Sequence, residues 1–77
     1  MKLTGVQIES FSKALMSAFP NRGELERMVL YHFGENLNTI VEASPLTYTV
    51  HKLIEWAMAR GSVAQLLKAA RTANPGN

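Results

Sequence analysis

The chain has 77 residues, enough for the single small domain over 1–77 that we expect, with a modest hydrophobic core. It contains no cysteine, which excludes disulfide bonds and thiolate metal sites and is typical of a cytoplasmic protein. Its net charge of +2 is too small to indicate a nucleic-acid partner, no apolar run approaches the roughly 18 residues that span a bilayer, and the N-terminus carries no signal-peptide pattern.

The two parts of the chain differ in charge. Residues 1–43 carry four basic and five acidic side chains, a net charge of −1. Residues 44–77 carry four basic side chains and a single acidic one, Glu55, a net charge of +3. This difference can help two copies or two homologous domains meet head to tail, and it is equally consistent with a solvated surface that has no partner.

The first half of the chain predicts two helices with clear boundaries. Thr4 and the glutamine three residues later have the spacing of a capping box, and Pro20 ends the helix that they begin. Asn21 and the glutamate three residues later begin the second helix, which Gly34 ends. The expected apolar faces hold Ile8, Phe11, Leu15, Ala18 and Phe19 in the first helix, and Leu25, Met28, Val29 and Phe33 in the second.

The middle of the chain predicts a short helix followed by a long one. Residues 35–43 predict one or two turns, partly 3₁₀, because their apolar side chains have helical spacing in a short, Asn-rich segment. Ser44 predicts the N-cap of the next helix, with Pro45 in its first position, where the missing N–H costs nothing. The expected core face of this long helix holds Leu46, Val50, Leu53, Ile54 and Ala57.

The end of the chain predicts a helical hairpin. Gly61 ends the long helix, and Ser62 caps the next one, with Gln65 completing a second capping box. The last helix is expected over 63–73, and Asn74-Pro75-Gly76 predicts the turn that ends it. So short a connection makes the two helices pack against each other.

The predicted fold class is all-α. Only residues 46–50 alternate like a strand, and a single strand cannot form a sheet. The helical periodicity elsewhere therefore predicts a five-helix bundle with four long helices and one short one.

Short sequence motifs follow one another along the chain in a specific order. They are Leu3-Thr4-Gly5, Ala18-Phe19-Pro20, Leu25-Glu26-Arg27-Met28, Asn36-Leu37, Leu53-Ile54-Glu55-Trp56-Ala57, Gly61 and Ala73-Asn74-Pro75-Gly76-Asn77. Together they resemble the bacterial effector-associated domain of type 1, a member of the death-like domains. The resemblance covers essentially the whole chain and implies a compact, antiparallel death-like bundle of five helices. His51 and Pro45 depart from the family pattern, and these departures concern local packing.

The resemblance implies an interaction module and not an enzyme. Domains of this family resemble adaptors in bacterial conflict and immune signalling, where they are fused to proteases, TIR domains or STAND-type ATPases. Contacts between two such domains are thought to bring an effector to its sensor. The implied partner is therefore another effector-associated or death-like domain, with no small-molecule substrate, no cofactor and no membrane.

The residue types that commonly act in catalysis or bind metals are scattered in the sequence and do not form a recognisable motif. His32 and His51 lie on different predicted helices without metal-ligand spacing, and we interpret His32 as a half-buried structural residue. The glycines are isolated, so no phosphate-binding loop is present. Glu24 and Glu26 lie two residues apart and face different directions, which is poor geometry for paired acid–base catalysis. We therefore expect no catalytic, cofactor-binding or metal-binding residues.

The alternative function is that of a small helical nucleic-acid-binding domain, a class that includes helix-turn-helix proteins. The last helix offers Gln65, Lys68 and Arg71 for contacts with bases and phosphates. The low overall charge, however, predicts weak and salt-sensitive binding.

Trp56 is either a packed residue or an interaction anchor. Counting about 100° per residue places it beyond the edge of the core face, near Thr49 and Arg60. Either the last helix or the first helix covers it, or it is partly exposed and anchors an interface, as tryptophan often does. The same question applies to three further side chains, Val6, Leu30 and Tyr31.

The charged residues predict two interaction faces. The basic face carries Lys13, Lys52 and Arg60, with Glu55 and Trp56 beside them. The acidic face carries Glu24, Glu26 and Glu35. The resemblance implies that unlike faces meet, and such heterologous contacts can propagate from one domain to the next. Charges at the rim would set the association rate and the choice of partner more than the affinity.

Overall fold

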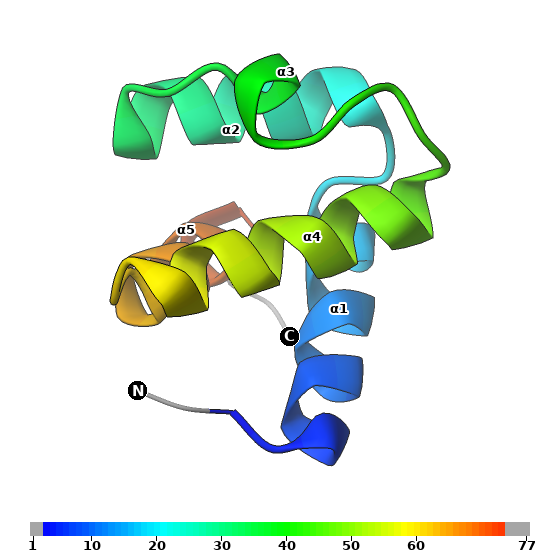
Figure 1. Ribbon diagram of the computed structural model, residues 1–77, viewed down its shortest axis with the longest axis vertical. Coiled ribbons are helices and arrows are strands. Elements are labelled where there is room, and N and C mark those ends of the chain that lie inside the picture. The colour runs from blue at the N-terminus through cyan, green and yellow to red at the C-terminus, as the bar shows by residue number, and fades with distance from the viewer. Residues whose placement is uncertain (1–2, 74–77) are drawn as a thin grey trace.

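The computed structural model of the protein describes residues 3–73, and these residues form five α-helices and no strand (Figure 1). The predicted all-α fold of four long helices and one short helix is confirmed. The helices are α1 (Gly5–Ala18), α2 (Arg22–Phe33), α3 (Leu37–Ile40), α4 (Leu46–Ala59) and α5 (Val63–Ala73).

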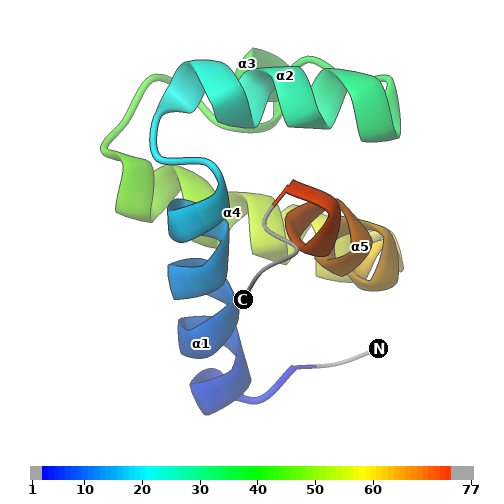
Figure 2. The same cartoon turned by 180° about the vertical axis from the view of Figure 1, so that it is seen from behind.

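The five helices surround one hydrophobic core. In Figure 1, α2 and α3 lie together on one side of α4, and α1 stands steeply across α4. Figure 2 shows the molecule from behind, where α5 lies against α4 and beside α1. The fully buried side chains at the junction come from all five helices, among them Leu15, Leu25, Leu37, Leu53, Ile54 and Leu66. The apolar periodicity of the sequence therefore identified the core correctly.

The N-termini of α1 and α2 are capped by the side chains of residues next to them in the sequence. The Gln7 amide N–H donates to Thr4 Oγ1 at 3.2 Å, and the Thr4 N–H donates to Gln7 Oε1 at 2.9 Å, so the predicted capping box is formed. The Glu24 N–H donates to Asn21 Oδ1 at 2.9 Å, which confirms the predicted start of α2. Both caps satisfy amide groups that a helix start leaves without an intrahelical acceptor.

Two glycines end helices in the left-handed conformation, as the sequence predicts. Gly34 has φ 66° at the end of α2, and Gly61 has φ 71° after α4. After α4, the Gly61 N–H donates to the Met58 carbonyl and the Ser62 N–H donates to the Ala57 carbonyl at 2.7 Å. This pair of hydrogen bonds is a Schellman motif, which reverses the chain in two residues and brings α5 back against α4.

The two predicted serine caps are wrong in detail. Pro45, and not Ser44, occupies the N-cap position of α4, and no side chain caps this helix. The Ser44 hydroxyl instead lies 2.7 Å from Thr49 Oγ1 and donates to the Glu42 carbonyl. At the start of α5, the predicted capping box does not form, because the Ser62 N–H donates to the Ala57 carbonyl and not to Gln65 Oε1, while Gln65 Nε2 donates to the His32 carbonyl of α2. In both places other hydrogen bonds have replaced the predicted caps.

The segment between α2 and α4 folds as one turn of α-helix, within the predicted range of one or two turns. Asn36 begins α3 by accepting a 2.9 Å hydrogen bond from the Asn38 N–H. Leu37 and Val41 are buried and anchor the segment in the core. The turn predicted at Asn74-Pro75-Gly76 lies outside the described residues.

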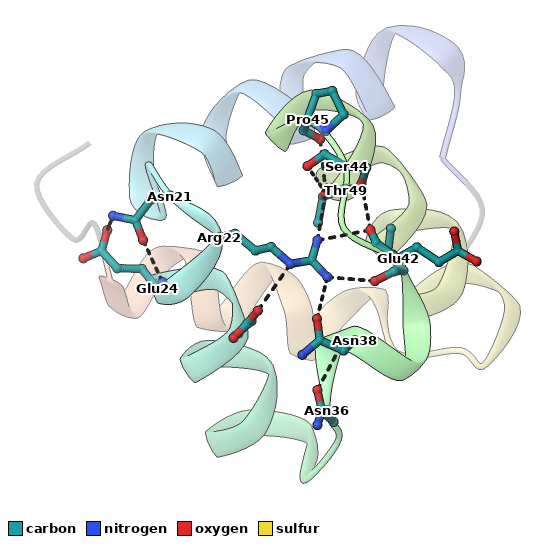
Figure 3. Close-up of polar contacts among 11 residues, drawn as sticks. Asn21, Arg22, Glu24, Asn36, Asn38, Glu42, Ser44, Pro45 and Thr49 are labelled. Carbon is teal, nitrogen blue, oxygen red and sulfur yellow. Dashed lines mark hydrogen bonds and ion pairs between the residues drawn. The ribbon is translucent and has the colours of Figure 1, made fainter.

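The guanidinium group of Arg22 joins the start of α2 to this segment and to α4 (Figure 3). Its Nη2 donates to the Val41 carbonyl at 2.8 Å and to Asn38 Oδ1 at 2.9 Å. Its Nη1 donates to Thr49 Oγ1 at 3.2 Å and to the Glu42 carbonyl at 3.4 Å. We call these contacts the Arg22 network. A planar guanidinium suits this role because it presents five N–H donors in a fixed arrangement.

The fifth donor of this guanidinium faces a carboxylate, which compensates the positive charge. Arg22 Nε lies 3.3 Å from Glu26 Oε2, one helical turn further along α2. The Arg22 side chain is only 22% exposed, so its removal would leave several carbonyl and amide acceptors without a donor in a poorly hydrated place. Thr49, which the helical period placed outside the core face of α4, is fully buried because this network encloses it.

We predict that Arg22→Met lowers the free energy of unfolding by about 2–3 kcal/mol, because it removes a donor to partly buried acceptors while keeping the aliphatic stem. Arg22→Lys should be intermediate, since a single ammonium cannot reach all the acceptors. Urea denaturation followed by circular dichroism measures both changes. Arg71→Met on the exposed face of α5 is the control and should stay within about 0.5 kcal/mol of the original chain. Equal losses from Arg22→Met and Arg71→Met would contradict the role of the network.

We also predict that Gly61→Ala destabilises the domain by about 1–2 kcal/mol, because a Cβ disfavours the left-handed conformation even where space is open. The matched control is Gly5→Ala in the first turn of α1, where φ is not positive and no atom lies within 4 Å of the added Cβ. This variant should be neutral or stabilising by at most about 1 kcal/mol. Thermal unfolding of the two variants in parallel tests the difference, and a neutral Gly61→Ala would refute it.

Candidate interaction surface

Two large apolar side chains are exposed on the outer side of α2. Leu30 and Tyr31 are 55% and 75% exposed, on the side of α2 opposite its buried residues. Arg27 stands one helical turn before Tyr31, and we call Arg27 and Tyr31 the α2 ridge. A large aromatic ring beside an arginine is a composition that protein interfaces favour. The exposure of Leu30 and Tyr31 answers the question that the sequence left open.

A shallow groove runs along each side of the α2 ridge. The α2–α3 groove is lined by Glu26, Arg27, Leu30, Tyr31, Glu35, Asn36 and Asn38, among others. The α2–α5 groove is lined by Phe19, Glu24, Arg27, Tyr31, His32 and Ala69, among others. Arg27 and Tyr31 border both grooves, so the ridge separates them. An acidic side chain therefore lies on each side of an exposed cation and an exposed aromatic ring.

The predicted acidic residues lie on this side of the molecule but are not equivalent. Glu26 and Glu35 border the α2–α3 groove, whereas Glu24 borders the α2–α5 groove. Glu26 is paired with Arg22, and Glu24 Oε2 accepts a hydrogen bond from Asn21 Nδ2 at 3.3 Å. Glu35 forms no ion pair within residues 3–73.

Two of the predicted basic residues, Lys13 and Lys52, are paired with carboxylates of their own helices. Lys13 on α1 pairs with Glu9 at 3.3 Å, and both side chains are 72% exposed. Lys52 on α4 lies 3.2 Å from Glu55, whose hydrogen bond and negative charge raise the pKa of the Lys52 ammonium. Glu55 also accepts a contact from His51 at 3.5 Å. Each of these surface pairs contributes little to stability, because exposed charges stay well hydrated.

Trp56 is partly buried, and its aromatic neighbour comes from α2. The Trp56 and Phe33 rings meet edge to face with their centroids 5.4 Å apart. The Arg60 guanidinium lies 4.4 Å from the centre of the Trp56 ring on the same helix. The contact with Phe33 is one that the sequence did not indicate, since it pointed to the last or the first helix. Trp56 therefore connects α4 to α2 and presents one side, with Arg60, to solvent.

The two histidines lie on different helices, as predicted. His32 is exposed and not half-buried as predicted, because its place on α2 lies beside the ridge and not over the core. His51 is also exposed, on α4. Within residues 3–73, no three histidine or acidic side chains gather closely enough to hold a metal ion. No helix in this part of the chain is long and apolar enough to cross a membrane.

The α5 surface is mixed in charge. Lys68 and Arg71 are exposed, but Glu24 of α2 faces the same groove as Ala69 and Thr72 of α5. Gln65, the remaining polar candidate on this helix, donates its side-chain hydrogen bond to α2.

A second apolar surface lies between α1 and α5. Val6 is 77% exposed there and borders a groove with Leu3, Phe11, Val63 and Leu67. No charged side chain lines this groove. This groove is therefore uncharged and mostly apolar, with Gln7 and Ser10 as its polar lining residues, in contrast to the grooves beside the α2 ridge.

Comparison with known proteins gives one result. The model of the family described as effector-associated domain 1 matches residues 1–77. No curated protein and no solved structure matches the chain. The family match spans every residue of the sequence, including all five helices, the outer side of α2 and the groove between α1 and α5. The chain therefore belongs to the effector-associated domain 1 family.

Proposed function

We propose that this chain is a single adaptor domain over 1–77 without catalytic activity, acting in the cytoplasm. It couples an effector to a sensor in bacterial conflict and immune signalling by binding another effector-associated or death-like domain, of the same or a related protein. The observation that carries the proposal is the family match over the whole chain, since the family is defined by association with effectors.

The surface chemistry supports this proposal. An exposed aromatic ring and an exposed leucine lie beside charges of both signs on α2, which is typical of a protein-binding surface. The histidine and acidic side chains of residues 3–73 form no cluster suited to a metal ion. A role in binding therefore accounts for the exposed groups better than a role in catalysis.

We propose two unlike faces for contacts with a partner domain. The basic face consists of Lys13, Lys52 and Arg60, with Glu55 and Trp56 beside them. The acidic face consists of Glu24, Glu26 and Glu35. Of the charged residues in these faces, Glu24, Glu35 and Arg60 make no ion pair within residues 3–73, and Glu24 accepts a hydrogen bond from Asn21, so Glu35 and Arg60 are the most available for a charged partner.

Nucleic-acid binding is the weaker candidate. The α2–α5 groove is lined by Glu24 and Arg27 of α2 and by neither Lys68 nor Arg71, and Gln65 is occupied by its hydrogen bond to α2. A duplex-binding surface needs several cations facing the phosphates together. The arrangement of α5 does not favour this function.

We predict that the purified domain binds the effector-associated domain encoded by a neighbouring gene and that Lys13→Glu/Arg60→Glu weakens this binding by about tenfold in low salt. The loss should arise mainly in the association rate and should shrink at high salt, because exposed charges are screened there. Surface plasmon resonance at two salt concentrations measures both effects. The double variant should keep its fold, since both residues are exposed, and circular dichroism checks this.

Lys68→Glu/Arg71→Glu is the matched control, because it reverses two exposed cations that lie outside the proposed faces. It should leave binding of the partner domain unchanged. A fluorescent duplex DNA serves as the competing probe. Tight duplex binding that the α5 variant abolishes, together with no binding of the partner domain, would replace the adaptor proposal with the nucleic-acid one.

A further inference from the structure

The α2 ridge has features that the hydrophobic core does not require. Tyr31 and Leu30 are largely exposed, although the same helix buries Leu25, Met28 and Val29 completely or nearly so. The ridge lies between two grooves, and in Figure 1 the whole of α2 lies at one edge of the molecule. A raised ridge flanked by two grooves is the shape by which one helix packs against another, with ridges entering grooves.

Two charged side chains, one in the ridge and one next to it, have no ion-pair partner within the described part of the chain. Lys13, Arg22 and Lys52 each have a carboxylate partner on their own helix. Arg27 and Glu35, by contrast, make no ion pair or side-chain hydrogen bond among residues 3–73, although both border the α2–α3 groove. Arg27 on α2 and Glu35 just beyond the end of α2 are thus a cation and an anion without an ion-pair partner among residues 3–73.

These two charges lie on either side of Tyr31 in the sequence, Arg27 on α2 and Glu35 just after Gly34 ends that helix, and all three residues line the α2–α3 groove. Arg27 precedes Tyr31 by four residues, and Glu35 follows it by four. If a second α2 lies antiparallel across the first with a twofold axis at Tyr31, Arg27 of each copy faces Glu35 of the other. The two Tyr31 rings then meet at the axis, and the Leu30 side chains flank them. A self-complementary patch of this kind is what a closed twofold dimer requires.

From this arrangement we propose that the α2 ridge binds a second copy of the same chain in a closed, antiparallel pair. The inference rests on the proposed function in that the partner is a domain of the same kind, but it assigns the contact surface and its symmetry. It also differs from the contact between unlike faces, because it closes after two copies and does not propagate.

The pair would have a consequence for partner capture. Glu35 belongs to the acidic face and also to the α2–α2 contact. A self-paired domain therefore cannot offer this carboxylate to another partner at the same time. Self-pairing and capture through the acidic face compete, so a partner domain that uses the acidic face separates the pair.

The test is a charge exchange between copies. Arg27→Glu places a new carboxylate opposite Glu35 of the other copy at both ends of the contact, and Glu35→Arg places a new guanidinium opposite Arg27 in the same way. Each variant alone should self-associate at least about tenfold more weakly than the original chain, because like charges meet twice. An equimolar mixture of the two variants should recover the original extent of pairing, since each carboxylate then faces a guanidinium. Sedimentation velocity up to millimolar concentrations measures all three samples.

One control and one further variant make the result specific. Arg71→Glu introduces the same charge change on α5 and should leave pairing unaltered. Tyr31→Ser should weaken pairing while circular dichroism shows an unchanged fold, because Tyr31 is 75% exposed.

The proposal is overturned if the original chain remains monomeric throughout, or if the mixture of Arg27→Glu and Glu35→Arg associates no better than either variant alone. Binding of the neighbouring-gene domain is measured on the same samples. Its retention by a monomeric chain would remove the α2 pair and leave the adaptor function intact. If the chain neither self-associates nor binds the neighbouring-gene domain, the proposed function is removed as well.

Discussion

The arrangement of the domain depends on one guanidinium group. Arg22 occupies the first position of α2, where it donates to the carbonyl groups of Val41 and Glu42 and to the side chains of Asn38 and Thr49. These acceptors belong to the segment between α2 and α4 and to the first turns of α4. A chain of this size has little apolar surface to spare, so a polar contact that joins three segments replaces part of the packing that a larger core would supply.

This network also explains how α2 presents its outer side. Its first residue is held against α4, and its last turn is held by the contact between Phe33 and Trp56 and by the hydrogen bond from Gln65 to the His32 carbonyl. With both ends attached, the buried side of α2 covers the core and the opposite side faces solvent. The exposure of Tyr31 is thus a consequence of contacts made by other residues of the same helix.

The charged surface divides into two groups for a simple physical reason. Glu9 with Lys13, and Lys52 with Glu55, stand three or four residues apart on one helix, where side chains of opposite charge meet without any tertiary structure. Arg27 and Glu35 are eight residues apart, on either side of a helix end, and form no such pair. Charges without such a partner are available for association, and Arg27 and Glu35 are two of them that border the same groove beside α2.

The sequence by itself determined the number of helices, most of their boundaries and the core, because these depend on residues close together in the chain. The Thr4 capping box, the Asn21 cap and the left-handed glycines Gly34 and Gly61 are examples, and the family could be identified from ordered local motifs. Tertiary structure decided the role of Arg22, the burial of Thr49 and the exposure of His32. It also directed Ser44 and Gln65 away from the local caps that their spacing predicts. For Arg22, Thr49 and Gln65 the deciding partner is on another segment of the chain, and a polar side chain with several possible partners takes the one that the packed helices bring within reach.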